Sequence, residues 1–75
     1  MGDGHLINTA NPDSLSKLDV AILAELASGG SQSMVARHLG MSSRTIRRRL
    51  RRICNRLEVE APIEAVAWAA RRRII

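Results

Sequence analysis

The sequence predicts an all-α fold of four short helices in one small domain. Apolar residues make up 45% of the 75-residue chain, yet it contains one Trp and no Phe or Tyr. The core must therefore be built from Leu, Ile, Val, Ala and Met, a composition that favours helices. These residues recur at spacings of three and four, and serines stand where helix N-caps are needed. A chain of this length is also short for an enzyme, which must enclose a substrate as well as bury a core.

The folded domain is expected to span residues 15–75. Residues 1–14 are rich in Gly, Asn, Asp and Pro and carry neither a helical nor a strand period. Such a segment is typical of a flexible N-terminal arm, either a natural leader or a remnant of expression.

The first helix is predicted to start after Ser16 and to end at Ser28. Asp19 stands at the N3 position, which makes a shortened capping box with Ser16, and Gly29 begins a glycine pair that supplies a left-handed stop. Its inward side is expected to carry Leu15, Leu18, Ile22, Leu23 and Leu26.

A second, shorter helix is predicted over residues 32–39, with Ser31 as its cap and Gly40 as its end. The inward side of this helix is expected to carry Val35, Ala36 and Leu39.

The third helix is predicted to follow Ser42 and to be strongly amphipathic. Its apolar residues fall within about 60° of one another around the helix axis; they are Ile46, Leu50, Ile53 and Leu57. The opposite side carries Arg44, Arg47, Arg48, Arg51, Arg52 and Asn55.

A fourth helix is predicted from Pro62, which suits a first helical turn, to about Arg73. Its apolar residues form two stripes. One stripe, containing Ala65, Val66 and Ala69, is expected to cover the core. A small domain has one inner surface, so the second stripe indicates a partner, and we expect a symmetric homodimer. The expected pairing residues are Ile63, Ala67, Trp68, Ala70 and Ile74. An Ala-rich face exposed to solvent is the alternative.

The charge of the chain points to a polyanionic partner. Twelve basic residues oppose seven acidic ones, which gives a net charge of +5, and seven arginines fall between residues 44 and 56 with no acidic residue among them. A merely solvated face and a membrane-surface helix are weaker alternatives. No run of about 18 apolar residues is present to span a membrane. The single cysteine, Cys54, excludes an intrachain disulfide, indicates a reducing cytoplasmic setting and is expected to be a small buried hydrophobe.

Residues 32–51 have the pattern of a helix-turn-helix. Ala36 is small where two helices must cross closely, Gly40 follows where the backbone needs a positive φ, and Met41 and Ile46 fill the angle between the helices. The second of these helices would fit the major groove of double-stranded DNA. Base contacts are expected from Arg47, Arg48 and Arg51. Phosphate contacts are expected from Ser42, Ser43, Arg44, Thr45, Arg52 and Arg56.

From Leu15 to about Ile74 the chain resembles the LuxR/GerE-type helix-turn-helix domain of bacterial transcription regulators. The residues that carry the resemblance are Leu15-Ser16, Asp19, Ile22-Leu23, Gly29, Val35-Ala36, Leu39-Gly40, Ser42, Thr45-Ile46, Ile53, Leu57, Val59 and Glu64-Ala65-Val66. The chain departs from the family at Met34, where Glu is usual, and at Glu58, where Gly is usual.

The resemblance implies that the third helix reads the major groove, that the fourth helix pairs two domains, and that the promoter sites are roughly twofold symmetric. By position, it places base contacts on Arg47, Arg48 and Arg51, and backbone contacts near Ser42, Thr45 and Arg56.

The expected function is therefore sequence-specific DNA binding in transcription regulation, with no enzymatic activity, no cofactor or metal, and no small-molecule ligand on this domain. RNA polymerase is a further expected partner. Two alternatives remain: a sigma-factor-like domain that reads a promoter together with polymerase, and a helix-turn-helix module that binds an acidic protein.

Overall fold

A computed structural model describes residues 15–75, which form four helices and no strand. The helices are α1 (Lys17–Ala27), α2 (Gln32–Leu39), α3 (Ser43–Leu57) and α4 (Pro62–Arg71). They confirm the predicted all-α, four-helix fold. The expected flexible arm, residues 1–14, lies outside the described residues.

The first three helices each begin at a serine N-cap, as the sequence predicts. The Ser16 hydroxyl accepts a hydrogen bond from the Asp19 N–H at 3.0 Å, and the Asp19 carboxylate accepts one from the Ser16 N–H at 3.0 Å. These two bonds form a complete capping box. Ser31 and Ser42 each accept a hydrogen bond from the backbone N–H three residues further on. The helix starts are therefore fixed by local side chains.

A residue with a positive φ follows each of the four helices: Gly29, Gly40, Glu58 and Arg73. Gly40 ends α2 with a φ of 67°, and the Met41 N–H donates to the Ala36 carbonyl at 2.8 Å, so the chain turns directly into α3. The fourth helix ends at Arg71, earlier than predicted, because Arg73 has a φ of 57° and the Ile74 N–H turns back to the helix.

All four helices contribute to one apolar core. The buried apolar residues are Ile22, Leu23, Val35, Ala36, Ile46, Leu50, Ile53, Cys54, Leu57, Ala65, Trp68 and Ala69. Leu15, Leu18, Leu26 and Leu39 pack partly buried against them. The predicted inward faces of the first three helices are thus confirmed.

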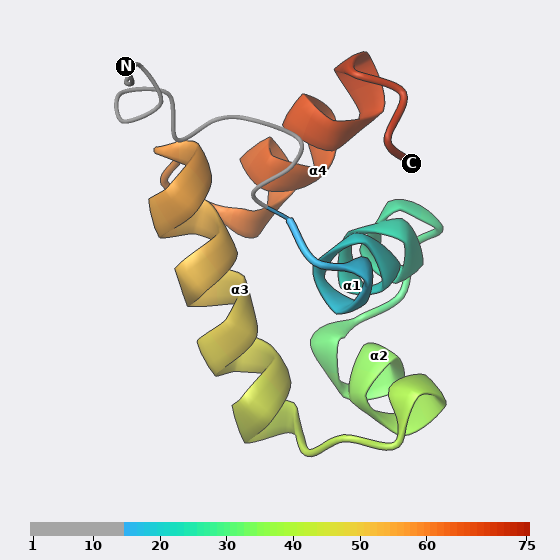
Figure 1. Ribbon diagram of the computed structural model, residues 1–75. Helices are drawn as coiled ribbons and strands as arrows, with labels where there is room; N and C mark the ends of the chain where they lie inside the picture. The colour runs from blue at the N-terminus through green and yellow to red at the C-terminus, as the bar shows by residue number, and fades with distance from the viewer. Residues whose placement is uncertain (1–14) are drawn as a thin grey trace.

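The longest helix, α3, runs along one side of the molecule, and the other three helices lie beyond its apolar side (Figure 1). The α2 and α3 helices pack together across the Gly40 turn and form the helix-turn-helix, while α1 and α4 cover the rest of the core. One full face of α3 is left without a neighbouring helix. None of the helices in residues 15–75 is long and apolar enough to cross a membrane.

Candidate nucleic-acid interface

The outward face of α3 is strongly cationic because its apolar stripe is committed to the core. Ile46, Leu50, Ile53 and Leu57 are each at most 3% exposed. The side chains on the other side of the helix must therefore point to solvent. The exposed residues of that side are Arg44, Arg47, Arg48, Arg51, Arg52, Asn55 and Arg56.

Four of these arginines line one shallow depression of about 200 Å³ on the surface: Arg44, Arg47, Arg48 and Arg51. We call this depression the arginine hollow. No carboxylate lines it, and within residues 15–75 none of the four guanidiniums forms an ion pair. Four like charges thus stand together on about two turns of one helix.

A second recess, of about 160 Å³, lies between α3 and the start of α1 and contains the other arginines of the run. Its walls are Ser16, Asp19, Arg49, Arg52 and Arg56. The Arg49 Nη1 atom lies 3.6 Å from the Asp19 Oδ1 atom, and both side chains are largely buried. Arg49 therefore turns inward against a carboxylate, unlike the four arginines of the arginine hollow.

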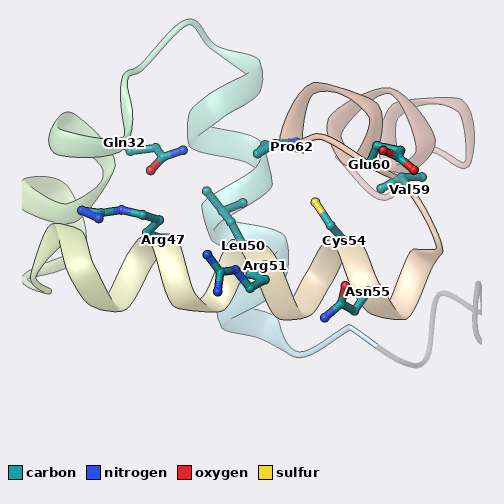
Figure 2. Close-up of a pocket in the computed structure, with 9 residues that line it drawn as sticks. All are labelled: Gln32, Arg47, Leu50, Arg51, Cys54, Asn55, Val59, Glu60 and Pro62. Atoms are coloured by element: carbon teal, nitrogen blue, oxygen red, sulfur yellow. The ribbon is translucent and has the colours of Figure 1, made fainter.

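A third depression, of about 230 Å³, borders the arginine hollow on the side of α2 and α4 (Figure 2). Figure 2 shows Gln32, the first residue of α2, on one side of it, with Arg47 and Arg51 on the α3 side. Gln32 is a polar residue beside these arginines that was not among the site residues expected from the sequence. Its signal is its position at the first turn of the first helix of the motif, where backbone N–H groups are free.

The hydroxyl groups at the start of α3 are partly engaged in the helix cap. The Ser42 and Thr45 hydroxyl oxygens lie 2.9 Å apart, and the Ser42 oxygen also accepts the Thr45 N–H. Ser43 is exposed beside them. The free N–H groups of the first turn of α3 lie here too, so this end of the helix carries a partial positive charge.

The structure divides the five expected pairing residues of α4 into two groups. Ile63 is 74% exposed, Ala70 is exposed and Ala67 is half-buried, so these three form an outward apolar stripe. Trp68, in contrast, is 5% exposed and belongs to the core, and the Arg72 guanidinium lies 4.3 Å from the centre of its ring. Ile74 follows the end of the helix and packs against the core. The last two side chains are therefore used within the domain.

Cys54 lies at the edge of the buried side of α3 and is 7% exposed, in agreement with its predicted role as a small buried hydrophobe. Burial, with a smaller contribution from the negative charge of Glu64, raises the pKa of its thiol. No group of three His, Cys, Asp or Glu side chains comes together within residues 15–75 as a metal site would need. What the described surface offers is a cationic helix face of a width that fits a DNA groove.

Comparison with known protein families agrees with this geometry. Residues 13–69, about three quarters of the chain, match the GerE model, which describes bacterial regulatory proteins of the luxR family. No curated protein and no solved structure matches the chain.

Proposed function

The chain belongs to the luxR family of bacterial regulatory proteins, and from that premise we propose how it binds DNA. The family is one of DNA-binding transcription regulators. In our proposal α3 enters the major groove of a duplex and reads its sequence through arginine side chains.

The observation that carries this proposal is the exposed arginine hollow on α3, whose lining within the described residues contains no carboxylate. An α-helix with its side chains is about 10–12 Å across, and the major groove of B-DNA is about 12 Å wide. The helix-turn-helix leaves this face of α3 free of other helices (Figure 1). A polyanionic groove would supply the negative charge that is absent among the described residues lining the arginine hollow.

The arginine side chains divide between bases and backbone in this proposal. Arg47, Arg48 and Arg51, which line the arginine hollow, would meet base edges. The backbone set would consist of Ser42, Ser43 and Thr45 at the helix start, with Arg52 and Arg56 beside α1. Arg44, expected from the sequence to contact phosphate, lines the arginine hollow with the base-reading residues.

We further propose that two copies of the domain pair through α4 to read two half-sites. The exposed stripe of Ile63, Ala67 and Ala70 supports this, because the core of the domain does not use it. A twofold dimer matches half-sites separated by about one helical turn, roughly 10 base pairs.

Alanine substitutions test the division between bases and backbone. Replacing Arg47, Arg48 or Arg51 should relax preference at particular base pairs, because each guanidinium addresses one base edge. Replacing Arg52 or Arg56 should weaken binding to all duplexes alike and reduce the slope of log affinity against log salt by about one. The measurement is the dissociation constant on a panel of duplexes, each with one base pair changed, at several salt concentrations.

Equal profiles for the two groups of variants would contradict the division. The same protein without polymerase also tests the alternatives. Binding only in the presence of RNA polymerase would favour the sigma-factor-like function. Absence of any mobility shift, with an acidic protein co-purifying after nuclease treatment, would favour the protein-interaction module.

A further inference from the structure

Resting on the proposed function, we propose that the arginine hollow reads a cluster of guanines, and that Arg44 is a fourth base-reading residue. Each half-site would then present two or more guanines within about three base pairs. The proposal gives the DNA ligand a base composition, and in it Arg44 contacts a base and not the phosphate backbone.

The chemistry of the exposed face favours guanine over the other bases. Arginine pairs bidentately with guanine O6 and N7, whereas adenine is matched by Asn or Gln, cytosine by Asp or Glu, and the thymine methyl group by apolar side chains. Between residues 43 and 54 the exposed residues of α3 are Ser43 and five arginines. The first amide side chain on this helix is Asn55, near its other end. The residues that line the arginine hollow are all arginines, whereas Asn55 and Gln32 line the neighbouring depression, so guanine is the base that the hollow itself can pair bidentately.

The spacing of the four arginines confines the guanines to a short stretch. From Arg44 to Arg51 the helix rises about 10 Å at about 1.5 Å per residue, which equals about three base-pair steps of roughly 3.4 Å. All four side chains line the same hollow, so together they would address one short stretch of the groove.

The placement of Arg44 supports its role as a reader. Arg52 and Arg56 line the recess beside α1 together with the Asp19 carboxylate. Arg44 lines the arginine hollow and has no ion pair within the described residues. It lies one turn before Arg48 on the same side of the helix, so the two residues are about 6 Å apart along the helix axis, or about two base-pair steps.

Binding-site selection with the 75-residue chain, followed by base-analogue substitution, tests the inference. Selection from random duplexes should return half-sites with clustered guanines. Replacing a contacted guanine with 7-deazaguanine removes N7 but keeps Watson–Crick pairing, and it should lower affinity about tenfold. The same change at a flanking adenine, to 7-deazaadenine, should leave affinity within about twofold.

Arg44→Ala and Arg52→Ala form the matched pair of variants, since both remove an exposed arginine from α3. In Arg44→Ala, 7-deazaguanine at one position should cause no further loss, because its partner is already absent. In Arg52→Ala, every analogue should still cost what it costs in the unchanged protein. Circular dichroism melting of both variants checks that each remains folded.

Two results would contradict the inference alone, and a third would also contradict the proposed function. Selected half-sites without guanine clusters would reject guanine reading, and an Arg44→Ala profile equal to that of Arg52→Ala would reject Arg44 as a base-reading residue; sequence-specific binding stands in both cases. Failure to bind or select any duplex would reject the proposed function together with the inference.

Discussion

At the scale of single residues, Cys54 is part of the core and also lines a depression on the surface. It lies next to the buried stripe and also lines the depression that contains Arg47 and Arg51 (Figure 2). The residue is 7% exposed, and burial together with the charge of Glu64 raises the pKa of its thiol. Ionisation of the thiol therefore costs more in the folded domain than in the unfolded chain.

The stability of the domain should fall at alkaline pH through Cys54. The folded-state pKa of the thiol is raised above its ordinary value of 9.0. Above that pH the unfolded chain loses the proton first, so stability is full below it and is lost as the pH rises. Urea unfolding between about pH 8 and about pH 10 should show a steeper loss for the unchanged protein than for Cys54→Ala. Parallel curves for the two proteins would contradict the prediction.

Side-chain direction on α3 could be predicted from the sequence, but the partners of its side chains could not. A 100° step per residue places Ile46 and Leu50 inside and Arg48 outside, and the structure agrees. The pair between Arg49 and Asp19 joins residues 30 positions apart in the chain. Helical periodicity contains no information about which helix will lie beside Arg49, so this pair required the fold.

At the scale of elements, the end of α3 is strained in a way that its start is not. Glu58 follows the helix with a φ of 58° and a ψ of 43°, a left-handed conformation that costs a residue with a β-carbon about 1–2 kcal/mol. Gly is usual at this position in LuxR/GerE-type domains. The left-handed conformation of Glu58 explains this preference, because glycine adopts it without a β-carbon clash.

Glu58→Gly should raise the free energy of unfolding relative to Glu58→Ala by about 1 kcal/mol. Both variants remove the carboxylate and whatever it contacts, so their difference isolates the β-carbon in the left-handed conformation. Thermal or urea unfolding measures this difference. Equal stability of the two variants would show that the turn relaxes without strain.

Helix starts were easier to predict than helix ends, because a start can be fixed by a nearby side chain whereas an end can depend on packing elsewhere in the fold. The side-chain oxygen of a serine such as Ser31 or Ser42 accepts a hydrogen bond from the first turn of the helix, so the start is fixed by the local sequence. The end of α4 is different, because Arg73 takes a left-handed backbone conformation although it is not a glycine. The residue after it, Ile74, packs against the core, and this contact lies outside the helix.

At the scale of the whole molecule, α4 carries an apolar stripe, Ile63, Ala67 and Ala70, that lies outside the core. The sequence predicted two apolar sides of α4 but assigned Trp68 to the outer one. Trp68 is 5% exposed and belongs to one core cluster with buried residues of all four helices. Its burial therefore depends on how the helices assemble, which a local pattern does not contain.

Ile63→Glu should abolish pairing without unfolding the domain, because this side chain is 74% exposed. Sedimentation should report monomers, and affinity for a duplex with two half-sites should fall about 100-fold through loss of effective concentration. Affinity for a single half-site should stay unchanged. Met34→Glu is the control, since it also replaces an exposed apolar residue, 45% exposed, but on α2. An unchanged dimer in Ile63→Glu would place the pairing surface elsewhere.

The arginine hollow has a thermodynamic consequence for the free domain. Four cations without a carboxylate among them attract small anions from solution. In the proposed complex, a duplex that occupies the hollow would displace those anions and release its own condensed cations. Much of the driving force would then be the mixing entropy of the released ions, so occupancy of a promoter would fall as the salt concentration rises.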